Sequence, residues 1–302
     1  MCGITALQLR NPAMRPQMGD LMRAMLCEMV ERGPDSAGLA IYDNPELVGH
    51  GESTLSLLGG SQALSTDDLT AALAGELPVE AKASVAVVGD TTLVSGDVST
   101  DVLAAALKAV LPQSTIIGRG AHLAVMKSVG DPLAVADDHG LSSMSGTQGV
   151  THTRMATESA VTAAGSHPFA VADDLCLVHN GSFSNHATIR RDLERTGVTF
   201  DSQNDTEVGA RYVASRLQQG DTLEQALVHL GEVFDGFYTL VVTTADSMAI
   251  VRDPIACKPA IIAETDDYIA MASEYRSLDG LPGIENARIF EPEPGRVYTW
   301  SL

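Results

Sequence analysis

The chain has 302 residues, 45% of them hydrophobic, and is long enough to bury one large core or two smaller ones. It never approaches 18 consecutive apolar residues, which excludes a transmembrane helix at the level of sequence. Its 39 acidic and 19 basic residues give a formal charge of −20, and because phosphate backbones repel such a chain, nucleic acid is not an expected partner.

The N-terminus and the cysteines indicate the cellular setting. The N-terminus lacks the basic region, apolar stretch and cleavage site of a signal peptide, so we expect the protein to stay in the cytoplasm. The four cysteines, Cys2, Cys27, Cys176 and Cys257, form no Cys-x-x-Cys pair and no zinc spacing. Neither a disulfide framework nor a metal site is therefore predicted.

The stretch Met1-Cys2-Gly3-Ile4 is the first candidate for chemistry. Removal of Met1 would leave Cys2 with a thiol nucleophile and a free α-amine, whose ordinary pKa of about 7.7–8.0 suits a general base. Gly3 would keep the space beside the sulfur free of a side chain, and Ile4 to Leu7 is typical of a buried strand. Taken alone, a cysteine at position two is more often an accident of sequence than a nucleophile, so partner residues elsewhere must support the catalytic interpretation.

A helix is predicted from Arg15 to Glu31, because four methionines recur on one face with helical spacing. They are Met18, Met22, Met25 and Met29, and we expect them to pack in the core. Gly33-Pro34 would end this helix. A polar loop through Gly38 then leads to a strand at Leu39–Tyr42.

Residues 51–148 are predicted to form an inserted small α/β module. The expected helices are Asp67–Leu77 and Thr100–Leu111, and the expected strands are Ser84–Val88, Thr92–Ser95, Ser114–Ile117 and His122–Lys127. Gly118 and Gly120 lack the third glycine and the following helix of a dinucleotide site. A structural or partner-contacting role is therefore favoured for the module.

The second half of the chain places polar residues where predicted strands end. A strand at Val150–Thr153 leads to Arg154, and a strand at Leu175–His179 leads to Asn180-Gly181. The expected helices are Asn185–Arg195, Asp205–Gln218 and Leu223–Glu232, the last two with caps at Asn204 and Asp221. Only strands are predicted from Phe237 to Trp300, which indicates mostly antiparallel sheets with helices on their outer faces.

These polar residues suit the recognition of an amino acid amide. The planar fork of Arg154 could clamp an α-carboxylate, and Asp205 could accept from an α-amine. Asn180 and the N–H of Gly181 form a plausible oxyanion pair. Each also has an ordinary interpretation, namely a surface ion pair for Arg154, a turn for Asn180-Gly181 and a helix cap for Asp205.

Five motifs together carry a family resemblance. In chain order they are Cys2-Gly3-Ile4, Arg32 to Gly38, His152-Thr153-Arg154, His179-Asn180-Gly181 and Asn204-Asp205-Thr206-Glu207. The chain resembles the class II glutamine amidotransferase domain of the N-terminal nucleophile (Ntn) hydrolases over residues 2–50 and 149–302. Arg252-Asp253-Pro254 with Lys258-Pro259, and then Ala272-Ser273-Glu274, resemble the later strands of that family.

The resemblance implies an α+β fold, a four-layer αββα sandwich with two mostly antiparallel sheets. It implies that Cys2 attacks the glutamine side-chain amide, that Asn180 and Gly181 stabilise the oxyanion, and that Arg154 and Asp205 bind the substrate. The residues with implied supporting roles are Arg32, Gly3, Thr157 and His167. We expect His152 and His179 to be structural. Met155 and Glu158 depart from the family, which weakens a sugar-phosphate amidotransferase interpretation.

The ammonia released would need an acceptor, and we expect it in another polypeptide because the chain ends after the last strand of the sandwich. The resemblance is to the separate amidotransferase subunit of glutamate synthase-like systems, including N-methylglutamate synthase. No cofactor is expected in this chain; a flavin and an iron–sulfur cluster are expected only in a partner subunit. Two alternatives are a stand-alone amidohydrolase acting on another γ-glutamyl amide, and a non-catalytic glutamine-sensing or assembly subunit.

Overall fold

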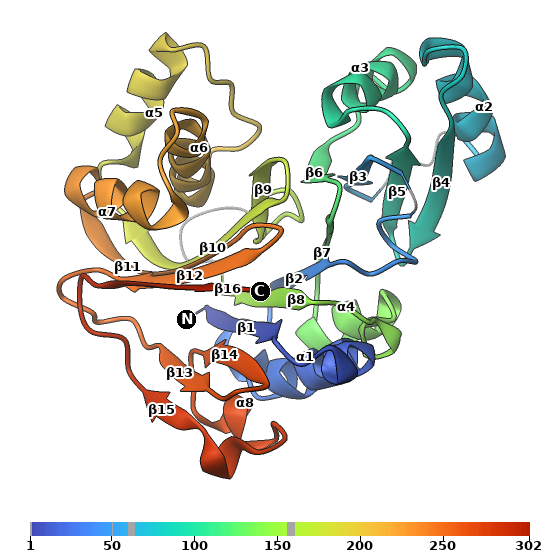
Figure 1. The fold of residues 1–302 in the computed structure, drawn as a ribbon. Helices are drawn as coiled ribbons and strands as arrows, with labels where there is room; N and C mark the ends of the chain where they lie inside the picture. Colours follow the sequence, from blue (N-terminus) through green and yellow to red (C-terminus); the bar gives the residue numbers. More distant parts are fainter. Residues whose placement is uncertain (1, 50, 60–63, 156–160) are drawn as a thin grey trace.

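The computed structural model describes residues 2–49, 51–59, 64–155 and 161–302, and it contains three antiparallel sheets (Figure 1). The strands of the seven-stranded sheet, in spatial order, are β15 (Arg288–Phe290), β13 (Ile261–Glu264), β14 (Tyr268–Ala272), β1 (Gly3–Leu9), β8 (Gln148–Arg154), β2 (Ser36–Tyr42) and β7 (Leu123–Val129). The strands of the five-stranded sheet are β16 (Val297–Ser301), β12 (Ser247–Arg252), β11 (Gly236–Thr243), β10 (Leu175–Phe183) and β9 (Phe169–Ala172).

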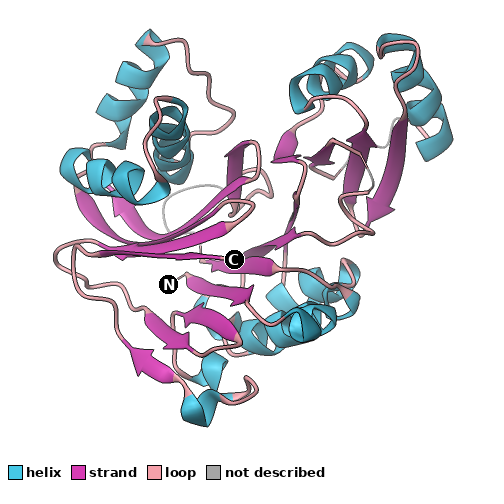
Figure 2. Ribbon diagram, viewed as in Figure 1, coloured by secondary structure: helices cyan, strands magenta, loops and turns pink. Residues whose placement is uncertain are grey.

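Helices cover the outer face of each of these two sheets (Figure 2). The five-stranded sheet carries α5 (His186–Arg195), α6 (Asp205–Gln218) and α7 (Leu223–Val233). The seven-stranded sheet carries α1 (Met18–Cys27), α4 (Pro132–Asp138) and α8 (Arg276–Asp279), with short 3-10 turns at Pro12–Gln17, Val30–Arg32, Leu141–Ser143 and Ile284–Asn286.

The inner faces of the two sheets pack on each other through a core of their own. Ile4 and Ala6 of β1 meet Val178 of β10 and Val241 of β11 in this core. Together with the two helical layers, this contact makes a four-layer αββα sandwich, so the predicted α+β fold is confirmed.

A separate four-stranded sheet lies beside the sandwich (Figure 1). Its elements are β3 (Ser53–Leu57), α2 (Thr66–Glu76), β4 (Ala83–Val88), β5 (Thr91–Gly96), α3 (Thr100–Val110) and β6 (Ile116–Gly120). The spatial order β4-β5-β3-β6 and the βαββαβ succession are those of a ferredoxin-like unit. Leu69 and Leu73 of α2 pack with Leu103 and Leu107 of α3 and with Leu55 of the sheet, which gives the unit its own core.

The separate unit is shorter than the predicted module of residues 51–148. Strand β7 pairs with β2 along Ser36–Tyr42, and α4 packs on the sandwich, so residues 121–148 belong structurally to the seven-stranded sheet. Strand β7 joins the larger sheet because both of its faces are apolar and need to be buried, and the sandwich buries both of them. Only residues 53–120 form the ferredoxin-like unit.

Two local predictions are tested by the helix ends and faces. The four methionines at positions 18, 22, 25 and 29 are buried, as predicted, although the regular helix α1 ends at Cys27. Asn204 caps α6 by accepting from the N–H of Thr206, as predicted. The prediction that Asp221 caps α7 is wrong: Thr222 is the cap, in a capping box with Gln225, because Asp221 pairs with Arg216 instead. In the described residues, no helix is long and apolar enough to cross a membrane.

Candidate active site

Strand β1 fixes the N-terminal segment in the middle of the seven-stranded sheet. It runs antiparallel to β8 on one side and β14 on the other. Its first residues are held by side chains as well, because the N–H of Gly3 donates to Thr153 Oγ1 at 3.1 Å and that of Ile4 to Ser273 Oγ at 3.0 Å. Cys2 therefore begins at a rigid point of the fold.

The register of β1 shows which way Cys2 faces. Ile4 lies opposite His152 and packs in the core between the sheets. Since side chains alternate along a strand, Cys2 also faces the five-stranded sheet, and the register extends to place it opposite Arg154. Cys2 is partly exposed, as a nucleophile must be.

Gly3 has a different role from the one predicted. A Cβ at this position would lie 2.8 Å from Thr153 Oγ1 and 3.1 Å from Met29 Cβ. It would therefore meet the helical layer on the outer side of the sheet, not the space beside the Cys2 sulfur. Gly3 is needed because β1 lies close to β8 and to the segment after α1 here.

Arg32 lies against Cys2, where the resemblance placed it. Its Nε donates to the carbonyl oxygen of Cys2 at 3.0 Å, and its Nη1 pairs with Glu274 Oε1 at 2.6 Å. Its Nη2 is buried and has no hydrogen-bond partner in the described part of the chain. The guanidinium thus holds the backbone of Cys2, and a carboxylate from the loop after β14 holds the guanidinium in turn.

Asn180 and Gly181 lie near the end of β10. Asn180 is 2% exposed, and its Nδ2 has no hydrogen-bond partner among the residues that the structure describes. It lies two residues after Val178, so both face the seven-stranded sheet and Cys2's side of the core. An amide donor in that position is available to a ligand.

The backbone around Gly181 is unusual. It has φ of +149°, and a Cβ would lie 2.0 Å from the carbonyl oxygen of Phe237, so only glycine fits. Tyr238, which lies opposite Gly181, directs both its N–H and its carbonyl to Asp253 on the far side of β11. In an antiparallel ladder, the N–H of Gly181 therefore points away from β11.

Asp205 lies in the first turn of α6, beside the end of β10. Its Oδ2 accepts from the N–H of Phe183 at 2.9 Å and lies 3.9 Å from His179 Nδ1. Glu207, two residues on, is buried and accepts from the N–H groups of Asp201 and Ser202, which fixes the loop that enters the helix. The Asp205 side chain itself is 23% exposed, so a ligand can reach it.

Arg154 ends β8 on the face shared with His152. It is 7% exposed; its carbonyl accepts from the N–H of Asp35 at 3.1 Å. A Cβ on Gly165 would lie 3.6 Å from Arg154 Nη1, so the guanidinium extends toward the segment before His167. Met1 and Thr157, also singled out from the sequence, lie outside the described residues.

Three buried histidines connect these elements. The rings of His152 and His167 lie 4.0 Å apart, and Thr206 Oγ1 bridges His167 Nε2 at 2.7 Å and His179 Nδ1 at 3.0 Å. Burial lowers the pKa of His152 to about 3 and that of His179 to about 4, and it holds the pKa of His167 well below its ordinary value. The rings are therefore neutral at pH 7 and act as packing and hydrogen-bonding groups.

Three contributing residues were not predicted from the sequence. Ser273 and Glu274 were noted only as part of a motif, yet they hold Ile4 and Arg32. Lys127 was assigned to a strand of the inserted module, yet its Nζ bonds three carbonyls of the segment around His167. The signal available in the sequence was one lysine in an otherwise apolar strand, which could have marked Lys127 as a buried cation with a structural role. In the described chain, no group of three or more His, Cys, Asp or Glu could hold a metal ion.

Comparisons with known proteins agree with this geometry. A family described as "Glutamine amidotransferase domain" matches residues 152–280. The glutamine amidotransferase-like protein GlxB of Rhizobium meliloti is 46% identical over 99% of this chain and 98% of its own length. A putative glutamine amidotransferase of Methanothermobacter thermautotrophicus is 29% identical over 99% of both.

The fold also matches a solved structure. Glutamine phosphoribosylpyrophosphate amidotransferase from B. subtilis superimposes with a TM-score of 0.60 at 19% identity, over 99% of this chain. The chain spans 47% of that longer protein. At this identity the match concerns the fold alone.

Proposed function

Because the chain belongs to the class II glutamine amidotransferases, we propose that it releases ammonia from the side-chain amide of glutamine through the thiol of Cys2. The observation that carries this proposal is the buried Asn180 Nδ2, which has no partner in the described chain and shares the inner face with Cys2. An unpaired buried amide costs about 1–3 kcal/mol, which a ligand can recover.

Glutamine binding is assigned to two side chains with opposite charge. Arg154 would hold the α-carboxylate through its planar fork, and Asp205 would accept from the α-ammonium. Arg154 ends β8 of the seven-stranded sheet and Asp205 begins helix α6, with the three histidines and Thr206 between them. A substrate that spans them would be an amino acid, and its side chain would extend toward Cys2.

The reaction would proceed in two halves, after Met1 is removed. The α-amine of Cys2 takes the thiol proton as sulfur bonds to the amide carbon, and it returns that proton to the nitrogen as the C–N bond breaks. Ammonia leaves, and a glutamyl thioester remains. The same amine then activates a water, which adds to the thioester and releases glutamate and the thiol. Asn180 Nδ2 and the N–H of Gly181 would donate to the oxyanion in each half.

The first experiment is the intact mass of natively expressed protein, before and after exposure to a diazo-ketone analogue of glutamine. We expect loss of Met1 and a single adduct that maps to Cys2. Cys27 and Cys257 are exposed thiols, so Cys27→Ser is a matched control that should still be labelled once. Retained Met1 with no adduct would overturn the mechanism and favour a glutamine-sensing or assembly subunit.

We further propose that the nitrogen passes to a separate glutamate synthase-like subunit that forms glutamate or N-methylglutamate. The support is chemical: hydrolysis without an acceptor would waste glutamine, and the sequence resembles the amidotransferase subunits of such systems. The flavin and iron–sulfur cluster of that chemistry would lie in the partner. Co-purification from native extract should yield a complex; a free monomer that also hydrolyses γ-glutamyl amides lacking an α-amine would favour a stand-alone amidohydrolase.

A further inference from the structure

Lys127 is a buried cation outside the residues assigned to catalysis. It lies on β7 opposite Gly38 of β2 and is 3% exposed. Its Nζ donates to the carbonyl of Ser166 at 2.9 Å, of Pro168 at 3.3 Å and of Ala164 at 3.4 Å. The ammonium thus directs its hydrogen bonds at one short segment, residues 164–168.

Burying the charge of Lys127 costs free energy, so a buried lysine here implies that its ammonium makes contacts that an apolar side chain could not make. Within the described residues, no carboxylate lies within ion-pair distance of Nζ. The ring of Phe169 lies 4.8 Å from Nζ, and the more distant charges of Glu207 and Asp201 favour the ammonium. A methionine or leucine would fill the same volume without the desolvation cost. The ammonium is therefore needed for the carbonyls that it holds.

The segment that Lys127 holds lies beside Arg154 and bonds the two residues that flank Asp205. Gly165 lies beside the guanidinium of Arg154, and its carbonyl accepts from Nδ2 of Asn204, the cap of the helix that begins at Asp205. His167 donates to or accepts from Thr206 at 2.7 Å. A shift of residues 164–168 would therefore change the separation of Arg154 and Asp205.

We propose that Lys127 is a positioning residue for glutamine: its ammonium fixes residues 164–168, and through them the distance between Arg154 and Asp205. The inference rests on the proposed function and adds a residue to it. Lys127 touches no reacting atom in this account. It acts on substrate affinity, so its loss should appear in KM rather than in kcat.

The charge on Lys127 also gives the site a pH limit. Burial lowers the pKa of this ammonium to about 8, against the favourable fields of Glu207, Cys176 and Asp201. The neutral His167 lies on the held segment itself. Above about pH 8 the amine would offer two N–H groups to three carbonyls and turn a lone pair toward one of them. The hold on the segment should therefore weaken as pH rises.

The test compares Lys127→Met and Lys127→Arg with the unmodified protein for glutamine hydrolysis between pH 6.5 and 9.5. At pH 7 we expect Lys127→Met to raise KM at least tenfold with kcat within threefold, and Lys127→Arg to restore most of the affinity. The part of the KM rise above pH 8 that exceeds the effect of the titrating glutamine α-amine should vanish in Lys127→Met. The α-amine of glutamine titrates equally in every assay, so differences between variants report Lys127. Lys108→Met, in the ferredoxin-like unit, is the matched control, since Lys108 Nζ also donates to a carbonyl, that of Ser114.

Hydrogen exchange of residues 161–169 in the same variants gives a readout that does not need activity. Faster exchange there in Lys127→Met, with the rest of the chain protected, supports the inference. Unchanged exchange, or an unchanged KM and pH profile, overturns it. If Lys127→Met does not fold, a KM of the unmodified protein that rises from pH 7 to 9.5 no more than the titration of the glutamine α-amine requires overturns it as well. Absence of any glutamine hydrolysis refutes the proposed function, and the exchange result still decides the role of Lys127.

Discussion

Asn180 is the side chain at which binding and catalysis can be separated. Replacing it with alanine removes one of the two proposed oxyanion donors while the rest of β10 stays paired with β11. We expect kcat to fall about 10²–10³-fold and KM to change little, because the hydrogen bond strengthens only as the oxyanion forms. Steady-state ammonia release measures both. Asn185→Ala, which removes an exposed amide that bonds the Val233 carbonyl, is the control; equal kcat in the two variants would contradict the assignment.

His152 links stability to pH. Its Nε2 must carry the proton, because it donates to the carbonyl of His179 at 3.1 Å, and its Nδ1 is buried without a partner in the described chain. Burial lowers its pKa to about 3, whereas the unfolded chain takes up the proton near pH 6.5. The unfolded state therefore binds more protons than the folded state between these values, and stability falls as pH drops from about 6.5 toward 3.

Between pH 7 and pH 5 this single site should remove about 2 kcal/mol from the free energy of unfolding. In His152→Gln, whose amide can still donate to the His179 carbonyl, the difference in free energy of unfolding between the two pH values should shrink by about that amount. Urea unfolding at pH 7 and pH 5 measures it. An identical difference in both proteins would show that His152 is protonated in the folded state.

At the level of residues, the sequence predicted which side chains form the candidate site better than it predicted what surrounds each of them. Cys2, Arg154, Asn180 and Asp205 could be named from motifs, although only Arg154 ends a strand and only Asp205 begins a helix. The reason why position 3 must be glycine could not be predicted, because the clash of a Cβ there with Thr153 and Met29 depends on how closely the helical layer packs.

One carboxylate makes three hydrogen bonds at the joint between the ferredoxin-like unit and the sandwich. Asp174, in the β9–β10 hairpin, accepts from the N–H groups of Ala121, His122 and Leu123 at 3.2, 2.8 and 3.1 Å. These residues connect β6 to β7. The carboxylate thereby ties the hairpin that leads to Asn180 to the start of the strand that carries Lys127.

Asp174→Ala should lower the free energy of unfolding by about 3 kcal/mol, because three backbone donors lose a charged acceptor. Asp173→Ala is a matched neighbour: its ion pair with Arg119 is half-exposed, so a loss of less than about 1 kcal/mol is expected. Urea unfolding of both variants tests the difference. If the two lose equal stability, the Asp174 contacts do not hold the joint.

The elements that were predicted correctly are those in which apolar residues recur at a regular helical or strand spacing. Helices α6 and α7 were predicted to within one residue, because polar starts precede clear apolar stripes. Strand β3, with the sequence Ser-Thr-Leu-Ser-Leu, was missed because its polar side chains are buried and hydrogen-bonded; for example, the N–H of Val125 donates to Ser56 Oγ. The extent of the module was misjudged for a related reason: only tertiary pairing assigns β7 to the larger sheet.

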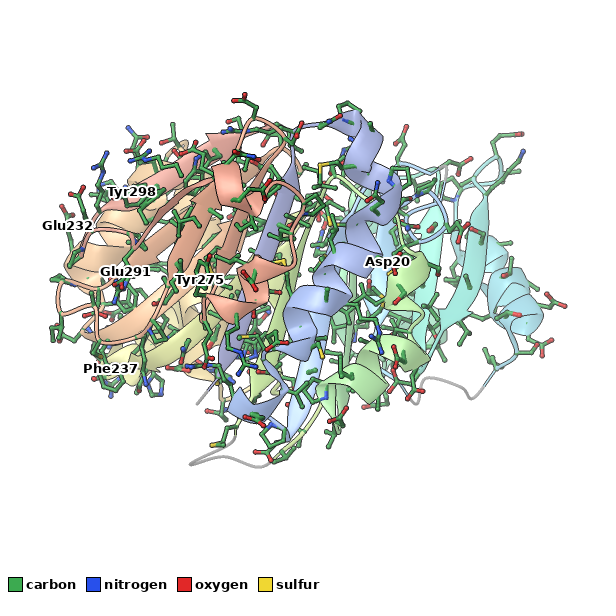
Figure 3. The ribbon with its side chains drawn as sticks, turned by 90° about the horizontal axis from the view of Figure 1, so that it is seen from below. Asp20, Glu232, Phe237, Tyr275, Glu291 and Tyr298 are labelled. Carbon is green, nitrogen blue, oxygen red and sulfur yellow. The ribbon has the colours of Figure 1, made fainter. Side chains whose placement is uncertain are left out.

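At the scale of the whole molecule, the acidity is distributed rather than concentrated. Asp20 of α1, Glu232 of α7 and Glu291 after β15 lie at the surface on different layers of the sandwich (Figure 3). The ferredoxin-like unit, residues 53–120, carries seven acidic and three basic side chains, a share close to that of the rest of the chain. Charge alone therefore does not select the unit as the partner surface.

A distributed charge of −20 nevertheless makes a prediction about the proposed complex. If the partner presents a basic face, raising ionic strength from 0.05 to 0.5 M should slow association about tenfold or more, because the Debye length falls from over 10 Å to a few Å. Dissociation should change less, since contacts already formed exclude ions. Binding kinetics of the purified subunits at several salt concentrations measure both rates. An association rate that does not depend on salt would mean that apolar or hydrogen-bonded contacts select the partner, and the exposed Val87 of β4 and Ile255 after β12 would become the first positions to substitute.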